Sequence, residues 1–553
     1  MSASNKKKLR KEQYAAQLTE KQLNEQKEAK KLKTYSLAFV AVMALVLVIA
    51  IVIASVTAYN NSGIRERNTD ALTVGNHTLT NAELNYFYID VIRETYNSWY
   101  NQYGDYTDMY VSWIFGLDVN SPLDQQNYDE NQTFNRYFAD LAAEDVKTMY
   151  AIYDEAIAKG HQRTEEEIAD VEETIDSMET YAKLNGTTLK QYLKTVYGNG
   201  AQKETFRNYL DLMSVVRSYQ TKYHDDLTYD ADALKEYNDK HFDEFSSFDY
   251  ITFFVNSNKF LSGGTKAEDG TTTYSDKEKA DALVAAEEAA KELVSSGATT
   301  NLALDSAIKE LAAYKDDSSA KSTESKNTLY TDINKYLAEW LVADDRKVGD
   351  LGYVKHTATT TDADGNETET VDGYYVVLMQ GRNDNEDKLV NVRHILIKPA
   401  GGTTDDSGNK IYSDEEWVAA KTKLEGIRDE WLAGEKTAES FGKIADEKTE
   451  DDGSKGNGGL YEDVHPGAMV KEFNDWIFDA SRKEGDYDIV KTEFGYHLIY
   501  FVNTCDETYR NHMIEDTMRE EDYKAWFDGL VEAASVTVLD DSLIEHDYIL
   551  AQG

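Results

Sequence analysis

The sequence predicts an α+β multidomain protein in which a single N-terminal transmembrane helix precedes a mostly helical domain and two related α/β modules. Three observations lead to this prediction. They are a long uncharged apolar run, a region in which apolar residues recur at helical spacing, and a strand–helix–strand pattern that occurs twice. The length of 553 residues suits three or four domains of ~100–200 residues each.

The composition excludes several classes of protein. A net charge of −44 argues against a nucleic-acid partner, because a polyanion would be repelled by most of the surface. The single cysteine, Cys505, excludes an internal disulfide framework, a zinc site built from cysteines and a CxxC redox motif. Neither an HExxH motif nor a P-loop occurs, so we expect no metal and no cofactor.

The apolar run near the N-terminus is predicted to cross the cell membrane once. No residue from Thr34 to Ile64 is charged, and residues 34–58 as a helix would rise ~37 Å, more than the ~30 Å hydrocarbon layer. The basic tail 1–33 carries a charge of +6 and the rest of the chain −50, which favours a cytoplasmic N-terminus and extracytoplasmic C-terminal domains. The alternative is a cleavable signal peptide, whose apolar core usually has only ~7–15 residues.

Residues 70–245 are predicted to form the first part of the helical domain. The segment 71–80 (ALTVGNHTLT) is typical of two short strands around a Gly-Asn turn. Apolar residues then recur every three or four positions as far as residue 240, and two of the predicted helices end on Gly160 and Gly186. The many carboxylates between 165 and 186 indicate a solvated helical face, since EF-hand spacing is absent.

Two stretches repeat one pattern, which we assign to modules at 246–384 and 388–503. Each begins with an apolar strand, FDYITFFV in the first and KLVNVRHILIK in the second, followed by a loop and a helix. Each also contains a tryptophan, an arginine six residues later and a Gly-Asp pair soon after, as in Trp340 and Trp476. The remaining residues, 504–553, are expected to form a helix near 507–533 and a strand at 535–540. We expect this strand to pair with 72–75 and complete the helical domain.

The second module carries a specific set of motifs. They begin with a strand that contains His394, a Phe-x2-Ile-Ala helix at Phe441–Ala445 and a Gly-Gly pair at Gly458–Gly459. Gly-x-Met-x3-Phe follows at Gly467–Phe473, and Thr-x2-Gly-Tyr-His at Thr492–His497. In this order and spacing they resemble the parvulin family of peptidyl-prolyl isomerases. The whole chain resembles extracytoplasmic foldases of the PrsA/SurA kind. This resemblance implies a SurA/PrsA-like chaperone domain and two parvulin-like modules, the first of them degenerate.

The resemblance also implies roles for individual residues. His394 and His497 would form a buried pair on neighbouring strands with Thr492 bonded to it, and Asp451 would lie near the substrate carbonyl. Asp452 is adjacent, so the register of the aspartate stays open. The substrate-binding residues would be Met469, Phe473, Leu460 and Phe494. The Gly-Gly pair is followed here by Leu-Tyr, whereas the family commonly has Asp-Leu-Gly.

The chemistry of X–Pro isomerisation suits such residues. Rotation about the peptide bond has a barrier of ~18–20 kcal/mol because twisting removes amide resonance. No bond is broken, so a protein needs only to bind the twisted amide better than the planar one. An apolar pocket for the proline ring is the main requirement. Met469 and Phe473 are four residues apart and would share one face of a helix.

Each residue also has a structural explanation when it is taken alone. A single histidine on an apolar strand, or a Met/Phe pair at helical spacing, is usually part of a core, and only their joint occurrence favours a site. In the first module, Thr252 stands where the second has His394, and Tyr375 where it has His497. We therefore expect catalysis only in the second module. Lys410 is the only basic residue in 400–414, which disfavours recognition of phosphorylated substrates.

The leading hypothesis is a membrane-anchored foldase that isomerises X–Pro bonds and assists the folding of newly exported, unfolded polypeptides. A second hypothesis is a non-catalytic holdase chaperone with an idle parvulin module. A third is a structural envelope protein with a relic module. The sequence leaves the oligomeric state open, including a dimer through the chaperone domain.

Overall fold

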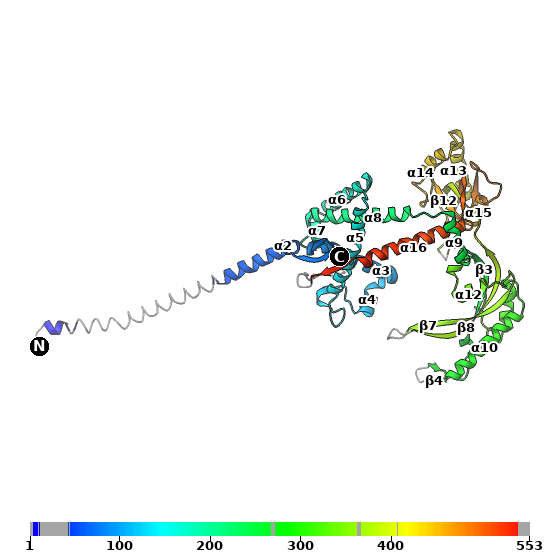
Figure 1. Ribbon diagram of the computed structural model, residues 1–553, viewed down its shortest axis with the longest axis horizontal. Helices are drawn as coiled ribbons and strands as arrows, with labels where there is room; N and C mark the ends of the chain where they lie inside the picture. Colours follow the sequence, from blue (N-terminus) through cyan, green and yellow to red (C-terminus); the bar gives the residue numbers. More distant parts are fainter. Residues whose placement is uncertain are drawn as a thin grey trace. The chain divides into compact units, whose positions relative to one another are not determined.

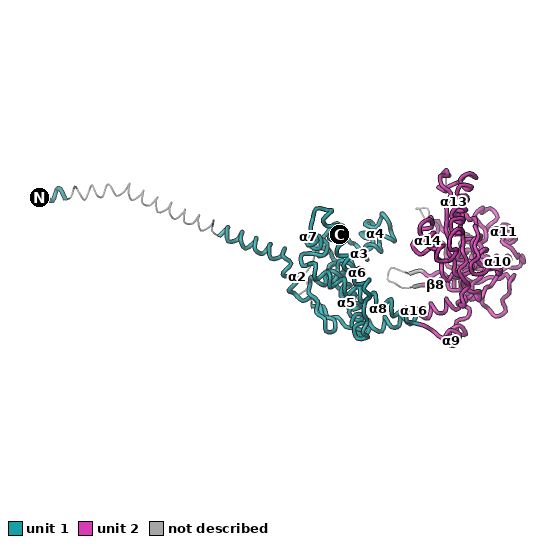
Figure 2. The backbone as a smooth tube through the Cα atoms, turned by 90° about the horizontal axis from the view of Figure 1, so that it is seen from above, with its two compact units in different colours: residues 1–227, 521–553 teal, residues 228–520 magenta. Residues whose placement is uncertain are grey.

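The computed structural model describes residues 4–8, 10, 43, 45–266, 271–361, 367–405 and 408–539. The chain divides into two compact units, residues 1–227 with 521–553 and residues 228–520 (Figure 2). Both predicted modules, 246–384 and 388–503, fall inside the second unit. Helices and strands both contribute to this mixed, multidomain fold (Figure 1).

The structure corrects the expected fold class at one point, the predicted transmembrane helix. Of the predicted span 34–58, residues 34–42 and 44 lie outside the described residues. Among the residues that are described, no helix is long and apolar enough to cross a membrane.

The first unit is a helical bundle built on one core. Its helices are α2 (Ile64–Asn68), α3 (Asn81–Tyr103), α4 (Thr107–Phe115), α5 (Phe134–Ala158), α6 (Glu165–Leu184), α7 (Leu189–Tyr197), α8 (Lys203–Asp226) and the last part of α16 (Tyr509–Ala533). Thr80 and Thr164 begin α3 and α6 with capping boxes, in which each side chain accepts from the third backbone N–H of its helix. The core between the helices is aromatic and includes Tyr86, Phe138 and Phe206.

A small sheet joins the two ends of this unit. The strand order is β15 (Val536–Val538), β1 (Asp70–Val74), β2 (His77–Thr80), all antiparallel. Leu72 lies opposite Val538, and Leu539 donates its N–H to the carbonyl of Ala71 at 2.8 Å. The predicted pairing of the first strand with the last is confirmed.

We predict that removing β15 destabilises the first unit. A chain that ends at residue 533 should melt about 5–10 °C lower in that unit than the whole chain, because β1 loses its ladder partner and apolar cover. Differential scanning calorimetry measures the shift. A chain that ends at 539 keeps β15 and is the matched control. Equal melting of the two truncated chains would contradict the prediction.

The second unit contains two four-stranded antiparallel sheets with corresponding strand orders. The first is β6 (Thr323–Leu329), β3 (Ser247–Asn256), β8 (Glu367–Asn383), β7 (Leu351–Thr361), and the second is β12 (Leu460–Val464), β9 (Lys388–Ile397), β14 (Tyr496–Thr508), β13 (Tyr487–Lys491). Each sheet also has a two-stranded hairpin nearby in sequence, β4 (Thr265–Lys266) with β5 (Thr272–Thr273) and β10 (Thr403–Thr404) with β11 (Lys410–Ile411). This shared order supports two copies of one module.

The helices cover the two sheets in the same way. The helices of this unit are α9 (Ala231–His241), α10 (Asp276–Ser295), α11 (Asn301–Glu310), α12 (Lys335–Leu341), α13 (Asp414–Ala433), α14 (Ala438–Lys448) and α15 (Lys471–Ile477). In the first module α10 and α11 pack on one face of the sheet and α12 on the other. In the second, α13 and α14 pack on one face and α15 on the other. The face toward α15 is the one that holds the site.

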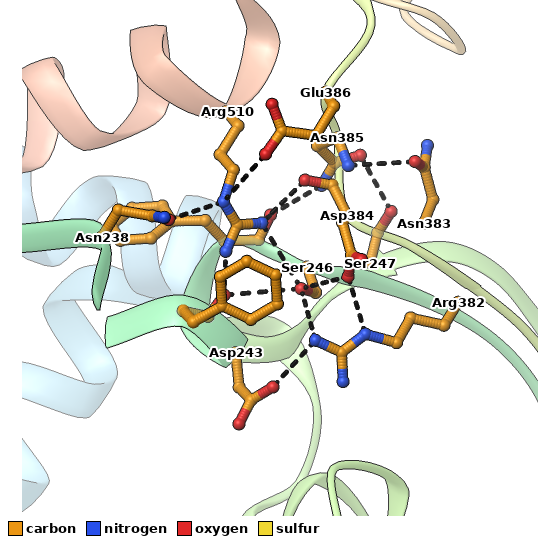
Figure 3. A network of polar contacts seen from close by, with 12 residues as sticks. Asn238, Asp243, Ser246, Ser247, Arg382, Asn383, Asp384, Asn385, Glu386 and Arg510 are labelled. Atoms are coloured by element: carbon orange, nitrogen blue, oxygen red, sulfur yellow. Dashed lines mark hydrogen bonds and ion pairs between the residues drawn. The ribbon is translucent and has the colours of Figure 1, made fainter. Parts of the chain in front are cut away.

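A buried arginine connects the parts of the second unit (Figure 3). Arg510, at the start of α16, is 1% exposed. Its guanidinium donates to the backbone carbonyls of Phe242, Phe245 and Asp384 and to the side chain of Asn238. It also lies 4.0 Å from the centre of the Phe242 ring. One side chain therefore holds α9, the connection between the two modules and the start of α16.

Candidate active site

Two buried histidines meet on the central strands of the second module. On the antiparallel pair β9 and β14, His394 lies opposite Ile499 and His497 opposite Leu396. Both side chains face α15, and they are 3% and 6% exposed. Their Nδ1 atoms are 3.1 Å apart and the rings stack with centres 5.3 Å apart.

The hydrogen bonds around this pair form one continuous chain. The ionised carboxylate of Asp451 can only accept, so Nε2 of His394 donates to its Oδ2 at 3.1 Å. With both rings neutral, Nδ1 of His394 accepts from Nδ1 of His497, and Nε2 of His497 accepts from the hydroxyl of Thr492 at 2.8 Å. The N–H of Phe494 then donates to Thr492 at 3.2 Å. The network thus assigns one tautomer to each ring.

The electrostatics of the site agree with this assignment. Burial and the neighbouring His394 lower the pKa of His497 to about 3, so this ring is neutral at pH 7. The hydrogen bond from His394 holds the pKa of Asp451 well below its usual range, so the carboxylate is ionised. Within the described ranges, no group of three or more His, Cys, Asp or Glu side chains is placed to hold a metal ion.

Two hydroxyl residues that the sequence did not single out complete the surroundings of Asp451. Ser454 donates both its hydroxyl, at 2.5 Å, and its N–H, at 3.1 Å, to Oδ2 of Asp451. Tyr461 donates its hydroxyl to the same oxygen at 2.9 Å. The order Asp-Asp-Gly-Ser is typical of a turn, which could have indicated that Ser454 lies close to Asp451. The structure also places Asp451 against His394, whereas Asp452 is exposed.

A glycine brings this loop onto the strand that carries His394. The N–H of His394 donates to the carbonyl of Gly459 at 2.8 Å. Gly459 has φ of +67°, and a Cβ there would lie 2.3 Å from the carbonyl oxygen of His394. A side chain at this position would push the loop away, which explains one member of the Gly-Gly pair.

Phe473 forms the apolar side of the site. It lies on α15, is 2% exposed, and points its ring edge-on toward both imidazoles, with centres 5.5 and 5.3 Å away. The expectation that Met469 shares a helical face with it is wrong, because α15 begins at Lys471. Met469 is partly buried and still packs against the same cluster. The Met/Phe pair is therefore brought together by the turn before the helix.

The other two expected substrate contacts lie at the edges of the site. Leu460 is partly buried at the start of β12. Its neighbour Tyr461, and not Leu460, packs against the cluster that contains Phe473. Phe494 is 56% exposed, in the turn between β13 and β14. Adjacent strand residues face opposite sides of a sheet, which explains why only one of Leu460 and Tyr461 reaches the cluster.

The first module carries different side chains at the matching positions. Tyr375 on β8 lies opposite Phe254, two residues after Thr252, as His497 lies opposite Leu396 in the second module. The sheet register thus places Thr252 and Tyr375 where the second module has its histidines. The ring of Tyr375 contacts Phe254 and His356, with centres 4.8 and 5.3 Å away. No histidine pair equivalent to that of the second module exists among these described residues.

Comparison with known proteins found a matching family and several relatives. Residues 374–504 match the family of the PPIC-type PPIASE domain. The chain is 30% identical over 211 residues to the chaperone SurA of Methylococcus capsulatus, which covers 36% of this chain and 43% of that protein. It is 33% identical over 145 residues to the foldase protein PrsA of Geobacillus kaustophilus, which covers 23% and 49%. The chain thus spans less than half the length of these curated relatives.

A solved structure of a relative was also found. The peptidylprolyl isomerase PrsA from Bacillus anthracis is 22% identical, with 27% of this chain and 59% of that chain covered and a TM-score of 0.17. The matched family segment, 374–504, contains β9, β12 and β13 of the second sheet and most of β14. It also contains the histidine pair, Asp451, Thr492 and Phe473.

Proposed function

We propose that the whole chain is an extracytoplasmic foldase that isomerises X–Pro bonds in unfolded, exported polypeptides, since residues 374–504 match the family of the PPIC-type PPIASE domain. The observation that carries the proposal is the histidine pair held between Thr492 and Asp451 beside Phe473. The names of the relatives, chaperone and foldase, support a role in folding. A membrane anchor is no part of the proposal.

The apolar residues of the site would bind the proline ring of the substrate. The proline ring is apolar and rigid, so contact with Phe473 and Met469 would hold it away from water. Once the ring is held, the residue before proline can rotate about the peptide bond. The barrier falls to the extent that the twisted amide is bound more tightly than the planar one.

Asp451 favours the twisted form by its charge. A planar amide carries partial negative charge on its carbonyl oxygen because of resonance, and twisting removes much of that charge. An ionised carboxylate near this oxygen therefore disfavours the planar ground state more than the twisted transition state. The imidazoles transfer no proton in this scheme. They hold Asp451 and Thr492 in place by hydrogen bonds.

An isomerase assay tests the proposed function. The full chain should accelerate isomerisation of a proline tetrapeptide with a kcat/KM of at least ~10⁴ M⁻¹ s⁻¹, within the usual range for enzymes. The uncatalysed reaction takes tens to hundreds of seconds, so the acceleration is measured by a stopped-flow or NMR exchange assay. The heat-denatured chain is the control. A rate equal to that of the control would refute the proposal.

A second candidate function, chaperone binding without catalysis, is favoured by an exposed apolar surface in the first unit. Around α4, the side chains of Tyr106, Met109 and Trp113 are 66%, 59% and 80% exposed. Exposed apolar groups of this kind commonly mark binding surfaces. A client-aggregation assay with a variant that lacks isomerase activity separates this function from catalysis.

A further inference from the structure

We propose that Tyr461 is a positioning residue for the isomerase reaction. Its hydroxyl anchors one carboxylate oxygen of Asp451 to the sheet, and the other oxygen is left for the substrate peptide. This inference rests on the proposed function and adds to it a residue that touches neither the proline nor the reacting bond. It also assigns separate roles to the two oxygens of Asp451.

The hydrogen bonds of Asp451 are divided unequally between its two carboxylate oxygens. Oδ2 of Asp451 accepts from Nε2 of His394 at 3.1 Å, from the hydroxyl and N–H of Ser454 at 2.5 and 3.1 Å, and from the hydroxyl of Tyr461 at 2.9 Å. Oδ1 accepts no hydrogen bond from the residues that the structure describes. The protein therefore occupies one oxygen and leaves the lone pairs of the other available.

The donors to Oδ2 of Asp451 come from different parts of the module. Ser454 belongs to the same turn as Asp451, so its two hydrogen bonds move with that turn. His394 on β9 and Tyr461 on β12 belong to the sheet, in which Tyr461 lies opposite Val392. Only the latter two donors belong to the sheet. Without the Tyr461 hydroxyl, His394 would be the one remaining direct tie of the carboxylate to the sheet, and the Ser454 hydroxyl, 3.2 Å from Nε2 of His394, would be an indirect one.

The ring of Tyr461 is held in place by its neighbours. It packs against the cluster of Phe473 and lies 5.0 Å, centre to centre, from the ring of His394. A Cβ on Gly453 would lie 3.3 Å from the hydroxyl, so the turn closes tightly around it. Burial and the hydrogen bond to Asp451 raise the pKa of Tyr461 to about 12, so it remains a donor throughout the physiological range.

The test is Tyr461→Phe, which keeps the ring and removes the hydroxyl. We expect kcat to fall about 5- to 10-fold with KM within about twofold, since orientation changes while the apolar contacts remain. Tyr487→Phe, which removes a hydroxyl from β13 at the far edge of the same sheet, is the matched control and should leave both constants unchanged.

A titration gives an independent readout. The titratable groups that face Asp451 are His394 from β9 and Tyr461 from β12, with His497 behind His394. The Tyr461 hydroxyl stabilises the charged carboxylate, so its removal should raise the pKa of Asp451. The acid limb of the kcat profile should move to higher pH with it. Carboxyl-detected NMR follows Asp451 directly in the full chain.

The outcomes separate this inference from the proposed function. If the wild type is active and Tyr461→Phe leaves both kcat and the Asp451 titration unchanged, the inference alone is overturned. A rise in KM without a change in kcat would also overturn it, because Tyr461 would then only line the binding surface. An inactive wild type would refute the proposed function. If Tyr461→Phe also left the pKa of Asp451 unchanged, the positioning role would be overturned as well.

Discussion

Replacing Asp451 with asparagine is expected to lower kcat/KM for X–Pro isomerisation roughly 100-fold, the size typical for loss of one electrostatic contact in an active site. The substitution keeps the shape of the side chain and its hydrogen bonds from Ser454 and Tyr461 but removes the charge. The loss should appear in kcat, because Phe473 and Met469 still hold the proline ring. The assay is that of the proline tetrapeptide.

Three variants serve as matched controls for this substitution. Asp452→Asn removes the adjacent, exposed carboxylate and should leave the rate unchanged. Thr252→Ala and Tyr375→Phe change the first module at the positions that match the histidines, and should also leave it unchanged. A large loss in Asp452→Asn would mean that the register of the aspartate is wrong. A large loss in either first-module variant would mean that the first module catalyses.

Arg510→Met is expected to lower the free energy of unfolding of the second unit by about 3 kcal/mol, because it strips buried acceptors of their donor. The carbonyls of Phe242, Phe245 and Asp384 all accept from this guanidinium (Figure 3). Methionine fills much of the volume, so the loss reports hydrogen bonds more than packing. Urea unfolding followed by tryptophan fluorescence measures it.

The comparison for Arg510→Met is Arg428→Met. Arg428 is partly exposed and forms an ion pair only with the exposed Asp429 among the described residues. Its removal should cost no more than about 0.5 kcal/mol, as is usual for surface ion pairs. Similar losses in the two variants would show that Arg510 does not connect the parts of this unit.

Features that repeat along the chain were predictable from the sequence. The two modules follow from spacings shared by Trp340 and Trp476, and the matching strand orders agree with them. The pairing of β1 with β15 also followed, because a short strand needs a partner and a single apolar segment near the C-terminus offered one. Both inferences depend on local propensity and periodicity, which the sequence carries directly.

The length of the run at 34–58 and its lack of charge predicted a membrane-spanning helix, and among the described residues no helix is long and apolar enough to cross a membrane. The helical face predicted for Met469 and Phe473 was wrong because residue spacing does not specify where a helix begins. Four-residue spacing places two side chains together only if the helix includes both, and α15 begins between them.

By itself, the sequence determined which residues are the candidates for the chemistry: His394, His497, Thr492 and Asp451 stand in motifs whose order identifies them. Only the tertiary structure decided how they are connected. It placed Asp451 rather than Asp452 on His394, brought Tyr461 and Ser454 onto a single carboxylate oxygen, and buried Arg510 among backbone carbonyls. The physical reason is that a hydrogen bond depends on distances of about 3 Å between groups far apart in the chain. Such distances follow from strand register and from where a turn closes, which residue spacing alone does not specify.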